Sequence, residues 1–161
     1  MTSASDTARG PRVVFPPPLL FVAGLGASLL LDQRLGIAID GDGSGFSQTV
    51  IGVVLVFAGL GVMIWGIATF LLARTAIYPN RPARQCVVAG PYRFTRNPMY
   101  VGLTIAYIGA AVVLNGVWPF VLLPLVLLAL QVFVIRREEA YLRLEFREDY
   151  DAYCRRVRRW I

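Results

Sequence analysis

The stretch that decides the fold runs over Met99–Ile135 and reads MYVGLTIAYIGAAVVLNGVWPFVLLPLVLLALQVFVI. It contains no charged residue, and an Asn-Gly dipeptide at 115–116, typical of a tight turn, divides it into two apolar halves. Because so short a connection brings the chain straight back, the stretch predicts an antiparallel hairpin of two membrane helices, at 99–114 and 117–135. The first half is short for a complete span, so we expect its start, at Pro98, to lie inside the protein.

Two more apolar stretches, at 13–31 and 50–72, precede this hairpin. The second has 23 residues without a charge, which is long enough to span a bilayer with some tilt. The first is also long, and no A-x-A cleavage site follows it, so we interpret it as an uncleaved span rather than a signal peptide. Glycines along the two stretches indicate close contacts between helices rather than phosphate-binding loops. They are Gly24, Gly26, Gly52, Gly59, Gly61 and Gly66.

The composition fits one membrane domain. The 161 residues are 57% hydrophobic, and the mean hydropathy is +0.60, well above the range of soluble domains. We therefore expect a single all-α integral membrane domain over 1–161. It would have about four transmembrane helices and, after the fourth, an amphipathic helix on the cytosolic side.

The arginines predict how the chain is oriented in the lipid bilayer. All sixteen basic residues are arginines. Five lie within 74–96 and eight within 136–159, whereas the 32–49 loop holds one and the 115–116 turn none. By the positive-inside rule, both termini and the 73–97 loop are cytosolic, in an inner or plasma membrane. We expect no nucleic-acid surface, because no basic stripe with interleaved aromatics lies outside the membrane-flanking segments.

The residue types that usually bind metals are absent or badly spaced. There is no histidine, and Cys86 and Cys154 do not form a C-x-x-C pair, so neither a zinc site nor a redox motif is predicted. The sequence DGDGSG at 40–45 matches the beginning of an EF-hand loop, but Ile51 stands where the bidentate glutamate would be. We interpret this loop as a flexible turn and expect no metal.

A dense set of polar and aromatic side chains lies directly before the third apolar stretch, in GPYRFTRNPMY at 90–100. A loop between two spans needs only polarity and a turn, whereas this segment combines cationic and amide donors, aromatic faces and a rigid proline. These side chains belong to Tyr92, Arg93, Arg96, Asn97, Pro98 and Tyr100. Their density at the boundary of the bilayer indicates a binding site.

The tail after the fourth stretch, RREEAYLRLEFREDYDAYCRRVRRWI at 136–161, holds the second informative pattern. Apolar and aromatic residues recur every three or four positions, which predicts a continuous stripe on one face of a helix. They are Leu142, Phe146, Tyr150, Tyr153, Val157 and Trp160. Glu138 and Glu139 flank this stripe one turn before Leu142, at the edge of the membrane, where two carboxylates are costly without partners.

The tail allows several interpretations. Its helix can lie on anionic lipid, or the glutamates can form a purely structural network with Arg136, Arg137 or the arginines of 90–100. A binding site is the third interpretation, because the hairpin returns the fourth span close to Pro98 and makes the two patterns neighbours on the cytosolic side. Together they suit a ligand with a carboxylate, an amine, hydroxyl groups and an aromatic ring. S-adenosylmethionine is one such ligand among several.

At these residues the sequence resembles a known family. The segments GPYRFTRNPMYVG and RREEAYL across a hairpin, followed by F-x-x-x-Y-x-x-Y-x-x-x-V, resemble the isoprenylcysteine carboxyl methyltransferases over roughly 75–160, and are similar to the related membrane phospholipid methyltransferases. The resemblance implies a membrane methyltransferase that uses S-adenosyl-L-methionine, held on the cytosolic side by the C-terminal half. The family's Arg-His-Pro-x-Tyr motif corresponds to Arg96, Asn97, Pro98 and Tyr100. Its Glu-Glu-x-x-Leu motif corresponds to Glu138, Glu139 and Leu142, and its aromatic tail to Phe146, Tyr150 and Tyr153.

The resemblance and the side-chain chemistry together imply roles. Arg96 would orient an anionic methyl acceptor and Glu138 would act as base for an amine acceptor, so these two are the expected catalytic residues. The expected cofactor-binding residues are Tyr92, Arg93, Asn97, Pro98, Tyr100, Glu139, Leu142, Tyr150 and Tyr153. Methyl transfer otherwise needs mainly proximity, orientation and exclusion of water. The acceptor, a lipid-like molecule or a small carboxylate, thiol or amine, would enter laterally from the bilayer.

Three positions depart from the family pattern. Asn97 stands where eukaryotic members have histidine, which keeps a hydrogen-bond donor without acid–base capacity. Arg147 replaces the glycine usual after the phenylalanine, so we expect the helix to continue there without a break. The chain ends in RVRRWI without the prolines of the prenylcysteine enzymes, so a prenylcysteine substrate is not supported.

Two functions of other classes stay open. Nicotinamide-dependent membrane reductases of the sterol type share a similar C-terminal architecture, although this chain lacks their several added spans. A non-catalytic membrane scaffold would explain the hairpin and the basic tail, but not the placement of the tyrosines, the Asn-Pro pair and the two glutamates.

Overall fold

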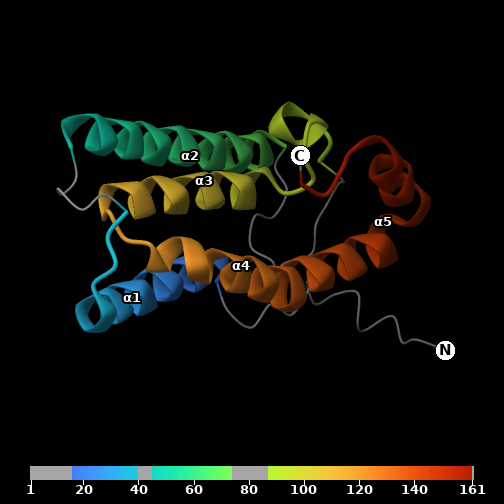
Figure 1. The fold of residues 1–161 in the computed structure, drawn as a ribbon. Helices are drawn as coiled ribbons and strands as arrows, with labels where there is room; N and C mark the ends of the chain where they lie inside the picture. The colour runs from blue at the N-terminus through green and yellow to red at the C-terminus, as the bar shows by residue number, and fades with distance from the viewer. Residues whose placement is uncertain (1–15, 40–44, 74–86, 161) are drawn as a thin grey trace.

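The computed structural model describes residues 16–39, 45–73 and 87–160, and every regular element in these ranges is helical. The order along the chain is α1 (Pro17–Leu35), α2 (Phe46–Leu72), the short 3₁₀ helix η1 (Gly90–Arg93), α3 (Pro98–Val113), α4 (Trp118–Leu130), the π-helix η2 (Gln131–Ile135) and α5 (Arg136–Arg156). Figure 1 shows α1 and α3 running in one direction and α2 and α4 in the other. The predicted all-α fold is confirmed.

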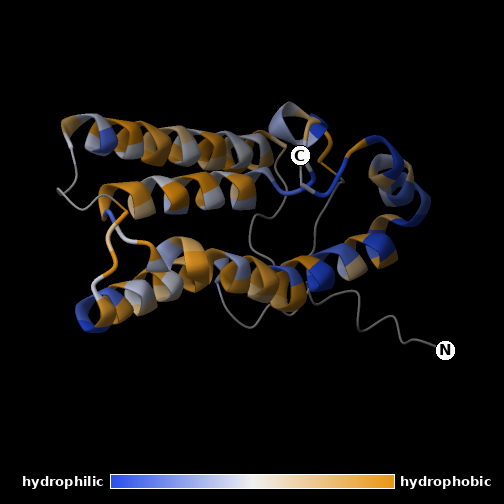
Figure 2. Ribbon diagram, in the orientation of Figure 1, coloured by the Kyte–Doolittle hydropathy of each residue, from blue (hydrophilic) through white to orange (hydrophobic). Residues whose placement is uncertain are grey.

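Three helices in the described ranges are long and apolar enough to cross a membrane: α1, α2 and the continuous helix Trp118–Arg156. The chain is therefore an integral membrane protein. At sixteen residues, α3 is about 24 Å long, which is less than the roughly 30 Å of a hydrocarbon core. Its first residue, Pro98, is fully buried, as expected for a helix that starts inside the protein. Figure 2 shows apolar residues along α2, α3 and α4, and hydrophilic ones gathered on α5 and before α3.

The first two spans differ from the prediction at their boundaries. α1 runs one turn beyond the predicted end, through Asp32 and Arg34, and stops where Gly36 adopts a left-handed conformation with φ 50°. α2 begins at Phe46, one turn before the predicted start. In both cases the helix includes polar residues beyond the apolar run. The prediction placed the boundary at the end of that run, because it used hydropathy alone.

Glycines bring α2 and α3 into backbone contact. Gly52, Gly59 and Gly66 are buried on α2 at intervals of seven residues, and Gly102 and Gly109 are buried on α3. A Cβ atom at Gly59 would lie 2.4 Å from the backbone nitrogen of Ala106. The prediction of close contacts is confirmed for these positions and for Gly24, which faces Val126. It is wrong for Gly26 and Gly61, which have open space around them.

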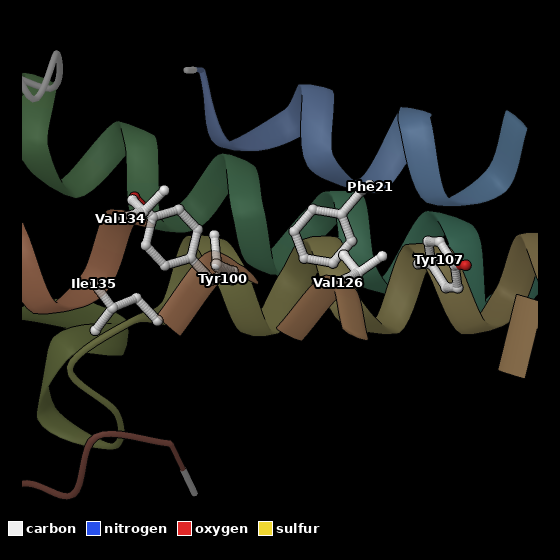
Figure 3. Close-up of a cluster of buried hydrophobic side chains, with 7 residues drawn as sticks. Phe21, Tyr100, Tyr107, Val126, Val134 and Ile135 are labelled. Atoms are coloured by element: carbon white, nitrogen blue, oxygen red, sulfur yellow. The ribbon is translucent and has the colours of Figure 1, made fainter. Parts of the chain in front are cut away.

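A buried hydrophobic cluster joins α1, α3, α4 and η2 (Figure 3). Phe21 of α1 meets Tyr107 of α3 edge-on, with ring centroids 6.1 Å apart. The Tyr107 hydroxyl donates to the carbonyl of Pro119 at 3.0 Å, which ties α3 to the first turn of α4. The other members are Tyr100, Val126, Leu130, Val134 and Ile135. The cluster therefore holds the predicted hairpin closed along its length.

The turn between α3 and α4 is tied to the loop that follows α1. Asn115 has φ 53°, and its carbonyl accepts from the backbone of Ile39 at 3.0 Å. Its side-chain oxygen accepts from Gln48 at 3.0 Å. These bonds close the end of the bundle opposite α5. The predicted flexible turn at 40–45 lies, up to residue 44, outside the described residues.

The C-terminal helix does not continue smoothly, which corrects the prediction for Arg147. This residue has φ 44° and ψ −115°, so α5 bends there. The helix ends at Arg156, and Val157 is extended, with φ −122° and ψ 129°. Val157 and Trp160 are therefore not part of one helical stripe. Figure 1 shows α5 bending and the chain returning toward η1 and the start of α3.

Replacing Arg147 with glycine is expected to stabilise the protein by about 1 kcal/mol. The backbone angles of Arg147 are near those of the first central residue of a type II′ turn, a position that glycine dominates, and such strain costs roughly 1–3 kcal/mol for other residues. The measurement is the melting temperature in detergent. Arg147→Ala is the control because it removes the arginine but keeps Cβ, so an equal rise in both variants would contradict the explanation by strain.

Candidate active site

The candidate site forms where η1, the start of α3, the start of α5 and the end of the chain meet. The segment after α5, Val157–Trp160, is called here the C-terminal strap. Its backbone is bonded to the segment before α3. The backbone N–H of Arg96 donates to the carbonyl of Arg158 at 3.0 Å, and the carbonyl of Arg159 accepts from Thr95 Oγ1 at 3.1 Å and from Asn97 Nδ2 at 2.9 Å. The two predicted motifs and the strap thus share one site.

Glu139 is held by two arginines. Its side chain is 7% exposed, and Arg159 binds both oxygens, with Nε 2.8 Å from Oε1 and Nη2 2.7 Å from Oε2. Arg96 Nη1 lies 3.3 Å from Oε1. The hydrogen bond to Glu139 raises the pKa of Arg159, so its guanidinium stays charged. A buried carboxylate needs such partners, since removing one leaves an uncompensated charge.

Glu138 points to a different partner. Its Oε1 accepts a hydrogen bond of 2.8 Å from the hydroxyl of Tyr100, in the first turn of α3. Successive residues of a helix project about 100° apart, so one carboxylate faces Tyr100 while the other faces the arginines. The paired glutamates therefore have separate surroundings, and Tyr100 engages only one of the two Glu138 oxygens.

Three buried tyrosines form an aromatic wall beside the glutamates: Tyr92 of η1, and Tyr150 and Tyr153 of α5. The Tyr153 hydroxyl donates to the carbonyl of Tyr92 at 2.7 Å, which fixes the bent part of α5 on η1. Phe70 of α2 meets Tyr92 edge-on at 5.0 Å. Burial raises the pKa of Tyr92 far above its usual range, and its hydroxyl therefore remains a donor.

Two buried donors at this site have no partner among the described residues: Tyr92 Oη and Arg96 Nε. Leaving a buried polar group unpaired costs about 1–3 kcal/mol, so such groups indicate where a ligand supplies an acceptor. The carboxylate of S-adenosylmethionine offers acceptors of this kind, Glu138 offers an acceptor for its cationic amine, and the tyrosines offer aromatic faces. The residues present therefore fit this cofactor.

Most residues predicted for the site come together in the structure. Tyr92, Asn97, Pro98, Tyr100, Glu139, Tyr150 and Tyr153 are buried there. Arg96, Glu138 and Leu142 are partly buried. Arg93 is exposed on η1, and Arg136 is exposed at the start of α5. The amide of Asn97 donates to the strap, so the histidine position of the family has a structural partner here.

Three residues of the site are absent from the prediction. Arg159 clamps Glu139, Thr95 holds the strap, and Cys154 Sγ accepts from Arg96 Nη1 at 2.8 Å. Arg159 belongs to a run of arginines, and nothing in the local sequence separates it from Arg155 or Arg156. Within the described ranges, no three Cys, Asp or Glu side chains are grouped as metal ligands.

A comparison with family models identifies the chain. Residues 47–149 match the model of the phospholipid methyltransferases, a range that contains all of α2 except its first residue, the hairpin and both glutamates. The same family includes the isoprenylcysteine carboxyl methyltransferase-like proteins that the motifs resemble. Searches of curated proteins and of solved structures gave no match. The match covers well over half of the chain, which therefore belongs to the phospholipid methyltransferase family and is a membrane methyltransferase.

Proposed function

We propose that the protein transfers a methyl group from S-adenosyl-L-methionine to a lipid-like or small acceptor at the cytosolic end of the bundle. The observation that carries this proposal is the pair of unpartnered buried donors, Tyr92 Oη and Arg96 Nε, in a site that also contains the carboxylate of Glu138. A carboxylate ligand satisfies the donors, and a cationic or hydroxyl group satisfies Glu138. S-adenosylmethionine carries both, and it supplies an activated methyl group.

The protein's own residues would bind, orient and exclude water. Arg96 and Tyr92 would hold the cofactor carboxylate, Glu138 its amine or ribose hydroxyls, and Tyr150 and Tyr153 would provide aromatic faces. Glu139 is also expected to contribute, through the arginine that it fixes and through its free lone pairs. These contacts provide orientation, which is the main requirement of methyl transfer.

The acceptor would approach from the bilayer. Tyr100 lies in the first turn of α3 and Glu138 in the first turn of α5, where the apolar helices give way to hydrophilic segments (Figure 2). A lipid head group would lie at this level. An amine acceptor would lose its proton to Glu138, whereas an anionic carboxylate or thiolate would need only the cation of Arg96. A lipid-like molecule, a small carboxylate, a thiol and an amine are all compatible with these groups.

The site is proposed to face the cytosol. Thirteen arginines lie within 74–96 and 136–159, on both sides of the site, and the positive-inside rule assigns such segments to the cytosolic face. The alternating directions of α1 to α4 place the start of α1 at the same end as the site (Figure 1). The N-terminus would then also be cytosolic.

The decisive experiment is a pair of titrations of the detergent-purified protein, with S-adenosylhomocysteine and with reduced nicotinamide cofactor. We expect saturable binding of the first alone. Binding of the nicotinamide cofactor instead would favour a reductase, and binding of neither would favour a scaffold. Repeating the S-adenosylhomocysteine titration in sealed vesicles of each orientation tests the side, because the charged ligand reaches only sites on the outer face.

A matched variant makes this titration specific for the site. Tyr92→Phe removes the unpartnered hydroxyl but keeps the ring that Phe70 contacts. Since that hydroxyl has no partner within the described residues, its loss should leave the melting temperature unchanged or higher. Affinity for S-adenosylhomocysteine should fall about tenfold, as for a lost hydrogen bond to a charged group. Unchanged affinity would remove Tyr92 from the site.

A further inference from the structure

We infer that Arg159 is a positioning residue, which holds Glu139 and thereby leaves Arg96 free to receive the ligand. This inference rests on the proposed function, because it assigns a task in the same site. It concerns a residue that touches neither the unpartnered donors nor Glu138, and that acts through another side chain.

Two arginines share the Glu139 carboxylate unequally. Arg159 takes both oxygens in a bidentate pair at 2.8 and 2.7 Å, whereas Arg96 reaches only Oε1, through Nη1 at 3.3 Å. Arg159 thus occupies one lone pair on each oxygen, and Arg96 makes a single contact with a lone pair that remains. Among the described residues, Arg96 uses only Nη1, which contacts Glu139 and donates to Cys154 Sγ, and its Nε remains unpartnered. Without Arg159, Arg96 would turn to pair fully with Glu139 and withdraw Nε from the ligand.

The strap is anchored independently of this ion pair. Its carbonyls accept three hydrogen bonds from residues 95–97. Val157 packs against the tyrosine cluster, and Trp160 packs against the cluster between α1, α3 and α4. An ion pair alone would make the strap a displaceable latch that blocks Glu139. Anchors on both sides of Arg159 instead make its position a fixed part of the site.

The three charged side chains differ in how deeply they are buried. The Arg159 side chain is 38% exposed, that of Arg96 12% and that of Glu139 7%. Arg159 therefore supports the carboxylate from the solvent side, while Arg96 lies on the inner side with the tyrosines.

The test compares Arg159→Gln and Arg159→Lys with Arg156→Gln, which removes the same charge from an exposed position in the last turn of α5. S-adenosylhomocysteine affinity and melting temperature are measured for each. We expect Arg159→Gln to lower affinity at least tenfold, and Arg159→Lys to recover only part of it because an ammonium cannot bind both oxygens as a fork. Arg156→Gln should bind normally. If Arg159→Gln does not fold, the lysine variant still decides, since normal binding by it would overturn the inference.

A double-mutant comparison separates positioning from mere stability. Because Arg159 acts through Glu139, the combination of Arg159→Gln with Glu139→Gln should bind no more weakly than the weaker single variant. If the affinity loss of the double variant equals the product of the two single losses, Arg159 acts independently of Glu139, and the inference is overturned. Tighter binding by Arg159→Gln would mean a blocking latch and would overturn it too. Normal binding by that variant refutes the positioning role alone, whereas absent binding by the unaltered protein refutes the proposed function and this inference with it.

Discussion

Replacing Gly59 with alanine is expected to destabilise the protein by about 3 kcal/mol, the upper range for overpacking a filled interior. The new Cβ would lie 2.4 Å from the backbone nitrogen of Ala106 and 2.5 Å from the carbonyl oxygen of Gly102. Both are backbone atoms, so no side chain can rotate to make room. α2 and α3 would have to separate along their shared face, which also carries Gly52 and Gly109.

Gly61→Ala is the matched control. This glycine lies two residues further along α2, and a Cβ there meets nothing within 4 Å. The substitution should change stability by no more than about 0.5 kcal/mol, as for surface positions. Both variants are compared by thermal unfolding in the same detergent. Similar melting temperatures for the two would mean that the α2–α3 contact is looser than the distances indicate.

Glu138→Gln is expected to lower ligand affinity, whereas Glu139→Gln is expected to lower stability. In Glu138→Gln the amide oxygen still accepts from the Tyr100 hydroxyl, so the fold should be nearly unchanged. Affinity for S-adenosylhomocysteine should fall by about 1–3 kcal/mol, because the acceptor loses its charge. In Glu139→Gln two arginines lose their counter-charge, and breaking a buried pair in this way costs about 3 kcal/mol or more of stability.

The two variants are measured side by side, for melting temperature and for S-adenosylhomocysteine affinity. The expected pattern is a stable, weakly binding 138 variant and an unstable 139 variant. A 138 variant with normal affinity and a lowered melting point would make the Tyr100 pair a structural contact only. A fully stable 139 variant would show that the arginine clamp is not formed as described.

Much of the fold follows from the hydrophobic pattern. Uncharged runs that are long enough to cross a bilayer form membrane helices. The short Asn-Gly turn then makes the two helices of the hairpin antiparallel. That arrangement alone brings Glu138 to Tyr100, which is why two motifs some forty residues apart were expected to meet. The end of α1 and the start of α2 were less predictable, since polar residues continue a helix as readily as they end it.

The strap could not be predicted, because it depends on a backbone conformation that the sequence disfavours. Arginine rarely adopts positive φ, so Arg147 indicated a continuous helix that would have carried the last residues away from the site. The bend instead returns them, and Arg159 reaches Glu139 twenty residues earlier in the chain. Tertiary contacts such as the bond from Tyr153 to Tyr92 override the local preference.

The π-helix η2 sets the rotational phase of the charged helix. A π-turn holds one residue more than an α-turn, and one residue corresponds to about 100° around the axis. Glu138 and Glu139 lie in the first turn of α5, which follows η2 directly, so the directions in which they project toward Tyr100 and Arg159 include that offset. In a related chain without the extra residue, the two glutamates would face different neighbours at the same distance from the membrane. Sequences of relatives are therefore best aligned starting from the two glutamates. A residue inserted or deleted within 131–135 changes the direction in which the glutamates project more than it changes the length of the helix.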